Sequence, residues 1–482
     1  PMHATPVLSI LGLLLTILAG TMMVPMLVDV VMGDPNWQAF AGAALVTGFV
    51  GVSLWLSNQH KNDRELGLKE AFLLTNGAWM LIGIFGAFPL YFSSLSLSFT
   101  DALFESVSGI TTTGSTILTD IEQASYGVLI WRALLQWLGG VGIIVMALAV
   151  LPMLSVGGMQ LFRTESYETA DKVIPRATQL AGGIFAVYTL LTGLWWLMLS
   201  LAGMPAFDAL AHAMTTLATG GYSTKTSSVG AFSSHTIELI IIAGMIVGSL
   251  PFIHYLSLAR GGWQALLRDP QVRWFMMLVL IVISFIAFDL FRDGVPLYDA
   301  IRLSSFNAIS ILTGTGYGTA NFALWGDSSL TILLICMFIG GCAGSTTCGI
   351  KMFRLQVLAA NIKVQLARLL RPHAVVLAYY NDRTVPDSVM DAVMGFFYLY
   401  IVCFVILATF LGLIGLDFQT ALSGAATSLS NVGPGLGDVI GPAGDFSSLP
   451  YAAKWLMCFG MLLGRLELFT VLVILNPLFW RR

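Results

Sequence analysis

Long apolar runs constrain the fold of this chain more than any other feature of its sequence. A helix needs about 20 apolar residues to cross a bilayer. Ten such runs lie near residues 7–32, 37–57, 70–94, 126–155, 177–202, 235–259, 273–291, 328–362, 389–415 and 449–480. Only 10% of the residues are charged, whereas a soluble domain is about a quarter charged. Because a bilayer offers no water to the backbone, the runs predict an all-α polytopic membrane protein.

Basic residues gather in alternate connections between these runs. Short cytoplasmic loops carry an excess of Lys and Arg. The connections rich in them contain Lys61, Arg64, Lys69, Arg163, Lys172, Arg176, Arg260, Arg268, Arg273, Lys363, Arg368, Arg371 and Arg383. The opposite connections hold little beyond Lys225, Arg292 and Arg302. We therefore expect both termini to be cytoplasmic.

Four of the outer connections are too apolar and too patterned to be plain loops. They read FTDALFESVSGITTTGST, AFDALAHAMTTLATGGYST, LYDAIRLSSFNAISILTGTGYGT and DFQTALSGAATSLSNVGPGLG. Each starts with an acidic residue near an aromatic one and ends in Gly, Thr, Ser or Asn. A helix of about 10–15 residues is too short to span, so each predicts a re-entrant half-helix.

The ends of these four segments share one glycine, and two apolar runs separate each from the next. This spacing predicts four helix–pore half-helix–helix repeats around a pseudo-fourfold pore, preceded by two N-terminal helices. The expected divisions are 1–63 for the extra helices, then repeats at 64–157, 158–264, 265–375 and 376–482.

Backbone carbonyls of four extended segments around one axis can replace the water shell of an ion. Glycine suits such a segment because it adopts backbone angles closed to residues with a Cβ atom. The candidate potassium-binding residues are Thr112, Thr113, Gly114, Thr219, Gly220, Gly221, Gly314, Thr315, Gly316, Asn431, Val432 and Gly433. Four unrelated glycine-rich outer turns are the alternative interpretation.

Glycines and hydroxyl residues interrupt the run at 328–362. They are Gly340, Gly341, Gly344, Ser345, Thr346, Thr347 and Gly349. Each glycine costs a helix about 1 kcal/mol, and the hydroxyls compete for backbone groups. We predict an unwound segment that gates the pore beneath the third filter. A small-residue packing face is the alternative.

Arg465 lies within the final apolar run, and an arginine at membrane depth should face protein or water. It is expected either to face the ion path as part of the gate or to anchor carbonyls of the unwound segment. Glu467 stands two positions on and does not share its helix face.

Six polar residues of the half-helices have expected supporting roles. Glu105, His212 and Asn307 are expected to brace the filter by hydrogen bonds. Asp101, Asp208 and Asp299 suit capping of the half-helix N-termini. A cation-attracting vestibule is the alternative for these aspartates.

The four filters, the interrupted stretch GGCAGSTTCGIK and the arginine of LLGRLELFT together resemble the Trk/Ktr/HKT superfamily of potassium transporters. The resemblance is closest to its bacterial TrkH/TrkG branch and covers nearly the whole chain. It implies potassium uptake across the bacterial inner membrane, with K⁺ as the transported ion at the filter carbonyls. It also implies a homodimer and a cytosolic nucleotide-binding regulatory ring (TrkA-like). Glycine at all four filter positions implies preference for potassium, because plant relatives that prefer sodium carry serine in the first.

Other classes of function find little support in the sequence. It contains no Walker motif, dinucleotide fingerprint, nucleophile elbow or HExxH pair. No enzyme activity and no cofactor are expected. A secondary transporter of another monovalent cation, either sodium or a proton-coupled one, is the alternative.

Overall fold

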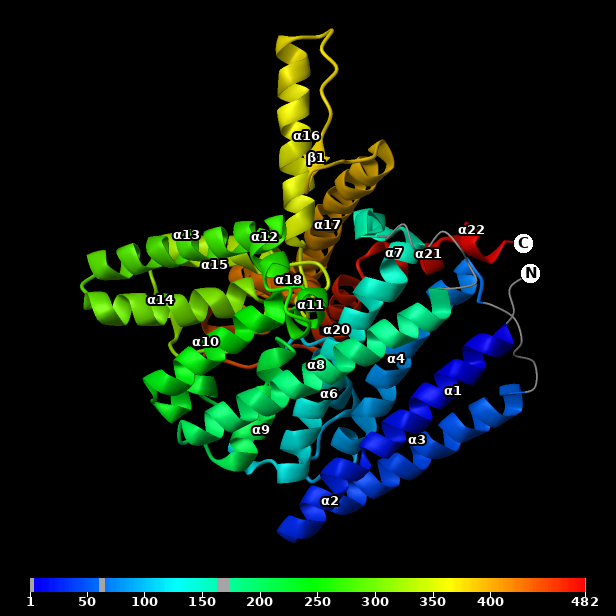
Figure 1. Ribbon diagram of the computed structural model, residues 1–482. Coiled ribbons are helices and arrows are strands. Elements are labelled where there is room, and N and C mark those ends of the chain that lie inside the picture. Colours follow the sequence, from blue (N-terminus) through cyan, green and yellow to red (C-terminus); the bar gives the residue numbers. More distant parts are fainter. Residues whose placement is uncertain (1–3, 60–65, 163–172, 482) are drawn as a thin grey trace.

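The computed structural model describes residues 4–59, 66–162 and 173–481, which are mostly helical (Figure 1). Lys61, Arg64, Arg163 and Lys172, used above for orientation, lie outside the described residues, as does the expected division at 63/64.

Within these ranges seven helices are long and apolar enough to cross a membrane. Two of the seven consist of consecutive pieces that run on as one helix, α1 with α2 (Ala4–Thr21, Met23–Met32) and α6 with α7 (Tyr126–Val145, Leu151–Leu154). The other five are α3 (Trp37–Asn58), α4 (Leu68–Tyr91), α8 (Val173–Leu201), α13 (Pro270–Arg292) and α17 (Asp387–Ile414). The predicted all-α polytopic class is thus confirmed.

Two runs predicted as single spans are instead sharply bent, and this part of the prediction is wrong. The run at 235–259 becomes α10 (His235–Ser249) and α11 (Phe252–Ala259), which meet at 99°. Pro251 starts the new direction because it has no N–H to continue the first helix. The run at 449–480 becomes α20 (Tyr451–Arg465) and α21 (Phe469–Leu475), which meet at 115°. Between these two, Leu468 has a positive φ of 56°.

The run at 328–362 is broken as predicted. Helix α15 (Asp327–Phe338) ends before the glycine-rich stretch, and α16 (Met352–Leu370) begins after it. Helix α16 stands out from the body of the protein at the top of Figure 1. The small elements are α12 (Gln264–Arg268), β1 (Tyr379–Tyr380) paired antiparallel with β2 (Arg383–Thr384), α19 (Gly437–Ile440) and α22 (Pro477–Trp480).

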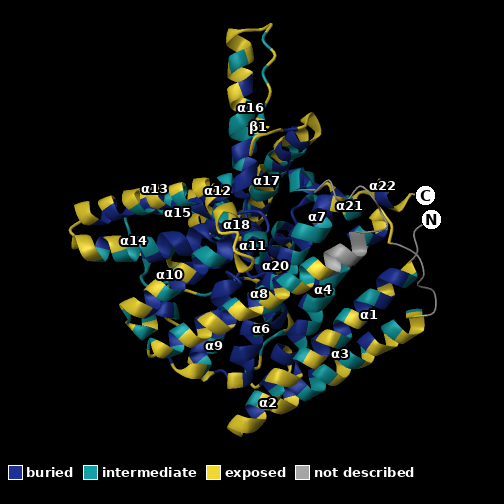
Figure 2. Ribbon diagram, in the orientation of Figure 1, coloured by how far each residue is buried: buried dark blue, intermediate teal, exposed yellow. Residues whose placement is uncertain are grey.

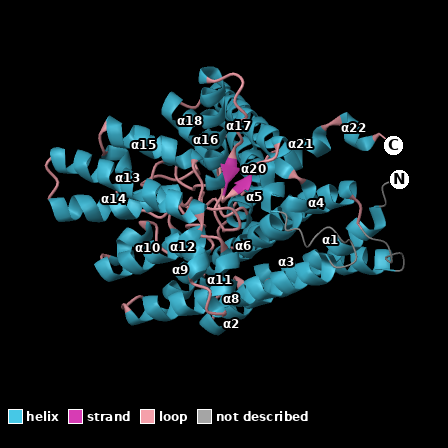
Figure 3. Ribbon diagram, turned by 45° about the horizontal axis from the view of Figure 1, so that its top comes forward, coloured by secondary structure: helices cyan, strands magenta, loops and turns pink. Residues whose placement is uncertain are grey.

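Four short helices occupy the places predicted for the half-helices. They are α5 (Phe99–Ile110), α9 (Ala206–Leu217), α14 (Leu297–Leu312) and α18 (Phe418–Ser430). Figure 3 shows loops gathering in the middle of the molecule with helices around them. Residues coloured as buried also concentrate there, while residues coloured as exposed are frequent on the outer helices (Figure 2).

Capping by the three half-helix aspartates is not observed as predicted. The N-cap positions of α5, α9 and α14 are Ser98, Pro205 and Pro296, and each aspartate lies inside the first turn. Their charge still favours the positive end of the helix dipole. The residue that caps α18 is Asp417, whose side chain accepts from the Thr420 N–H.

A buried carboxylate docks the N-terminal hairpin, whose helices α1 and α3 lie side by side on one flank (Figure 1). Asp29 of α2 is fully buried. It accepts hydrogen bonds from Gly127 N (2.7 Å), Asn36 Nδ2 (3.1 Å) and Ser125 Oγ (3.1 Å). The N–H of Gly127 belongs to the first turn of α6, where a negative charge is favourable.

Replacing Asp29 by alanine is expected to lower thermal stability, because it removes the acceptor of the buried Gly127 N–H and of the Ser125 hydroxyl. The loss is on the order of 2 kcal/mol. Melting temperature of the purified protein measures it. Asp391→Ala, at an exposed position of α17, is the matched control. Equal melting temperatures for the two variants would contradict the docking role.

Candidate ion-conduction site

The twelve candidate filter residues lie directly after the C-termini of α5, α9, α14 and α18, where all four segments turn back in the same way. In each, the N–H of the middle residue donates to a carbonyl of the preceding half-helix. The donor–acceptor pairs are Thr113–Ser108 (2.9 Å), Gly220–Thr215 (2.9 Å), Thr315–Ser310 (2.9 Å) and Val432–Thr427 (3.1 Å).

The backbone of the four segments alternates in the same pattern. The first residue of each has a positive φ, at Thr112 (53°), Thr219 (49°), Gly314 (68°) and Asn431 (55°). The third also has one, at Gly114 (87°), Gly221 (83°), Gly316 (88°) and Gly433 (118°). Only glycine adopts the third conformation without strain, which explains why this residue is shared.

We call the shared third residue of each segment its central glycine. Each central glycine faces a carbonyl oxygen of the next segment, and the four contacts close a circle. A Cβ atom built on the glycine would lie less than 3.0 Å from that oxygen in every case. The pairs are Gly114 with Gly220 O, Gly221 with Thr315 O, Gly316 with Val432 O and Gly433 with Thr113 O. We call the twelve residues the filter ring. The structure therefore brings all four predicted segments together.

The bracing predicted for three half-helix residues is confirmed. Each side chain forms a hydrogen bond with the residues that follow its own filter segment. The contacts are Glu105 with Thr116 Oγ1 and Ile117 N (both 2.9 Å), His212 Nε2 with Ser223 Oγ (2.8 Å), and Asn307 Nδ2 with Thr319 Oγ1 (3.0 Å).

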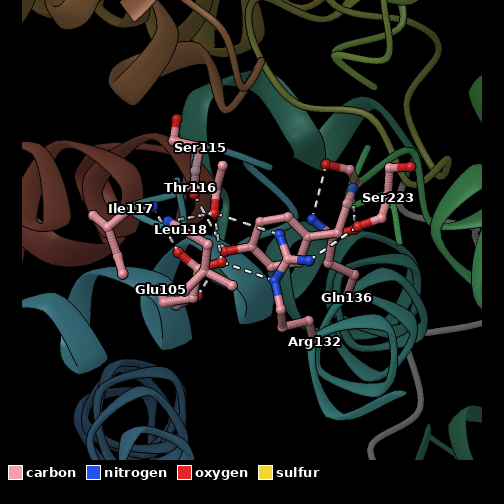
Figure 4. Close-up of polar contacts among 10 residues, drawn as sticks. Glu105, Ser115, Thr116, Ile117, Leu118, Arg132, Gln136 and Ser223 are labelled. Carbon is pink, nitrogen blue, oxygen red and sulfur yellow. Dashed lines mark hydrogen bonds and ion pairs between the residues drawn. The ribbon is translucent and has the colours of Figure 1, made fainter. Parts of the chain in front are cut away.

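Sequence reasoning missed the buried ion pair behind the first two filter segments (Figure 4). Arg132 Nε of α6 lies 2.8 Å from Glu105 Oε1, and both side chains are buried. Its Nη1 donates to Ser223 O at 3.0 Å, and the guanidinium lies 4.0 Å from the centre of the Tyr222 ring. An arginine inside an apolar run was the available signal.

Replacing Arg132 by methionine is expected to destabilise the protein strongly. It leaves the Glu105 carboxylate buried without a cation, which costs about 3–5 kcal/mol. Arg302→Met is the control, because the Arg302–Glu238 pair has a partly exposed arginine. Thermal unfolding should show a much larger loss for Arg132. Losses of similar size in the two variants would mean that burial does not determine how much the Arg132–Glu105 pair contributes to stability.

A cavity adjoins the filter ring on the side of the residues that follow the four segments, such as Thr116 and Ser223. All four central glycines line it, together with two basic residues, Arg132 and Lys225. Asp101, Asp208 and Asp299 are not among its lining residues. Asp101 instead forms an ion pair with buried Lys454 of α20 at 2.6 Å. The vestibule interpretation of these aspartates is therefore not supported.

The predicted gate segment lies buried against the ring. Thr346 Oγ1 is 3.0 Å from Thr219 Oγ1, in the second filter segment, and donates to Gly248 O (2.9 Å). The Cys342 N–H donates to Ser249 O (3.0 Å), at the bend between α10 and α11. The predicted gate glycines and hydroxyls, Gly340, Gly341, Gly344, Ser345, Thr346, Thr347 and Gly349, are all buried.

Arg465 links the gate segment to α6 by hydrogen bonds. Its Nη1 donates to Thr346 O and its Nη2 to Gly139 O, each at 3.0 Å. Glu467 pairs with Arg354 of α16 at 2.7 Å, which agrees with the expectation that it would not partner Arg465. Lys351, just after the segment, is also buried. Sequence reasoning gave Lys351 and Arg354 no role.

Half-helices that end at one ring inside a bundle of membrane-length helices define a pore-type membrane transport protein. Residues 36–478 match the TrkH family of cation transport proteins. The chain belongs to this family.

Individual relatives match over at least 97% of their length. Trk system potassium uptake protein TrkI of Halomonas elongata is 42% identical and covers 99% of this chain and 97% of its own. Trk system potassium uptake protein TrkH of Escherichia coli K12 is 38% identical, with 100% of both chains covered. The crystal structure of the potassium transporter TrkH from Vibrio parahaemolyticus superposes with a TM-score of 0.91 at 35% identity, again covering 100% of both chains.

Proposed function

We propose that this chain mediates potassium uptake by passing K⁺ through the filter ring. The observation that carries the proposal is the closed circle in which each central glycine faces the next segment's carbonyl oxygen. Potassium prefers oxygen ligands, and carbonyls offer them without a fixed charge, so a bound ion can leave again. The relatives named as potassium uptake proteins support this choice of ion.

The half-helices add a favourable field to the ring. Each ends within one residue of its filter segment, so the partial negative charge at its C-terminus points toward the ion. Within the described part of the chain, no group of three or more His, Cys, Asp or Glu residues could hold a metal ion. The backbone oxygens of the filter ring are the proposed ligands of K⁺.

The segment from Gly340 to Gly349 is proposed as the gate. Its contact with Thr219 places it directly against the ring, and Arg465 holds its backbone. Opening requires that these contacts break.

The cellular setting completes the proposal. The chain would lie in the bacterial inner membrane with both termini cytoplasmic, as a homodimer regulated by a TrkA-like nucleotide-binding ring. The membrane-length helices and the family support a multi-pass protein. Segments 64–157, 158–264, 265–375 and 376–482 are proposed as the four pore repeats, after the N-terminal helices of 1–63.

Ion flux into vesicles containing the purified protein tests the function. Membrane voltage and the pH gradient are varied separately, with K⁺ or Na⁺ as the cation. We expect flux that follows voltage and the potassium gradient and exceeds sodium flux. Uptake that requires a pH gradient, or equal flux of both ions, would instead support a secondary transporter of another monovalent cation.

A further inference from the structure

The second filter segment differs from the other three at its middle residue. This residue is Gly220, whereas the other segments have Thr113, Thr315 and Val432. Unlike the central glycines, Gly220 does not have a positive φ. Its backbone conformation would therefore accept a side chain, and another cause must explain the glycine.

The side chain of Gln136 supplies this cause. A Cβ atom on Gly220 would lie less than 3.0 Å from Cγ, Cδ and Oε1 of Gln136. Gln136 belongs to α6 and is fully buried. Its carboxamide therefore occupies the space into which a side chain at residue 220 would point.

The same carboxamide holds the backbone on both sides of Gly221 (Figure 4). Its Nε2 donates to Gly220 O at 2.8 Å, and its Oε1 accepts from Tyr222 N at 3.0 Å. Gly220 O is also the ring oxygen that faces Gly114. One filter oxygen thus carries a protein hydrogen bond in addition to its place in the ring.

Gln136 departs from the pattern of the other inner helices. In three of the four helices that follow the filter segments, α6 itself together with α10 and α20, a glycine packs against a carbonyl oxygen at the end of the half-helix, in the pairs Gly139–Ile110, Gly248–Leu217 and Gly464–Leu429. Three positions before these glycines stand Gln136, Met245 and Met461, and Met337 precedes Gly340 by the same spacing. The amide replaces methionine in the one helix that faces a glycine at the middle filter position.

We propose that Gln136 is a positioning residue that determines ion selectivity. It replaces, from the neighbouring helix, the side chain that the second filter segment lacks, and it fixes the two peptide groups around Gly221. By sharing Gly220 O it makes this oxygen a weaker ion ligand than its counterparts. The inference rests on the proposed conduction of potassium through the filter ring.

Gln136→Glu tests the electrostatic part, because it changes the charge at nearly constant volume. Burial disfavours the charged form of the introduced carboxyl, so flux is measured at a pH at which it is ionised. The carboxylate then cannot donate to Gly220 O and places a strong negative field beside the ring. A stronger field favours the smaller cation. We expect the potassium-to-sodium flux ratio to fall about tenfold, equivalent to about 1.4 kcal/mol. Gln123→Glu, at an exposed position of the short 3-10 helix Ile121–Gln123, is the matched control and should leave the ratio unchanged.

Substitution of Gly220 and Gln136, singly and together, tests the claim that the Gln136 side chain occupies the space of a residue-220 side chain. Gly220→Thr alone should collide with Gln136, and Gln136→Met alone should leave the Tyr222 N–H unpaired. Each should reduce the flux ratio. The double variant has the residue types of Thr315 and Met245 and should recover much of the loss, which appears as coupling between the substitutions. Independent effects that simply multiply would overturn the inference.

The failure of this inference is distinguishable from failure of the proposed function. Gly221→Ser alters the ring itself, so an unchanged flux ratio in that variant would reject the filter function. A changed ratio in Gly221→Ser together with an unchanged ratio in Gln136→Glu would reject only the role of Gln136. If Gly220→Thr does not fold, the flux ratio of Gln136→Glu still decides whether Gln136 affects ion selectivity.

Discussion

Gly316→Ser is expected to lower potassium flux relative to sodium flux. A Cβ at residue 316 would lie less than 3.0 Å from Val432 O, and φ is 88°. Serine in such a backbone conformation costs about 1–3 kcal/mol of strain. If this strain acts on ion binding, the flux ratio changes about 5- to 150-fold.

Two further variants define the scope of this result. Gly318→Ser is the matched control, because a Cβ there meets its first neighbour at 3.9 Å and the ratio should remain unchanged. Gly114→Ser should act like Gly316→Ser, since Gly114 faces Gly220 O in the same way. Flux of both ions is measured in vesicles, with protein content normalised. Unchanged selectivity in both ring variants would refute the four-segment filter.

Arg465→Ala is expected to raise basal potassium flux when no regulatory partner is present. The substitution removes hydrogen bonds from Arg465 to Thr346 O and Gly139 O. Bonds to a charged group are worth about 1.5–3 kcal/mol each. A closed state weakened by about 3 kcal/mol changes the open-to-closed ratio by roughly a hundredfold. Deleting Ser345 to Thr347 should raise flux for the same reason.

Arg465→Lys distinguishes the two interpretations of this residue. Lysine keeps the positive charge but loses the planar fork that joins two carbonyls. If the charge itself opposes the ion, Arg465→Lys should remain closed while Arg465→Ala opens. If the gate depends on anchoring the segment, both variants should open.

Melting temperature is measured on the same preparations as flux. A purely structural anchor would lower the melting temperature and leave flux per folded molecule unchanged. Arg302→Ala is the control, since this arginine is bonded to Glu238 and Asp299 rather than to the gate segment. A stable deletion variant that stays fully closed would remove the gating proposal.

The fold class and the positions of the four filter segments could be predicted because each depends on local properties of the chain. Apolar runs of membrane length must become helices, since lipid satisfies no backbone group. Gly114, Gly221, Gly316 and Gly433 stand out because residues with a Cβ atom are strained at a positive φ. Clustered glycines and hydroxyls marked the break after α15 for a similar local reason.

The bends could not be predicted in the same way. The runs at 235–259 and 449–480 are both predominantly apolar, and hydrophobicity carries no information about the direction in which a helix runs. Pro251 was a local signal, but a single proline is also compatible with a mild kink. The turns of 99° and 115° depend on what packs against each helix.

The sequence by itself determined a polytopic helical protein with four glycine-centred segments, because bilayer length and backbone sterics act within a few neighbouring residues. Only the tertiary structure decided which residues meet. Arg132 and Glu105 are joined at 2.8 Å, Arg465 reaches Gly139, and Gln136 fills the place beside Gly220. These contacts join separate helices, so their partners are set by packing in three dimensions and leave no periodic signal along the chain.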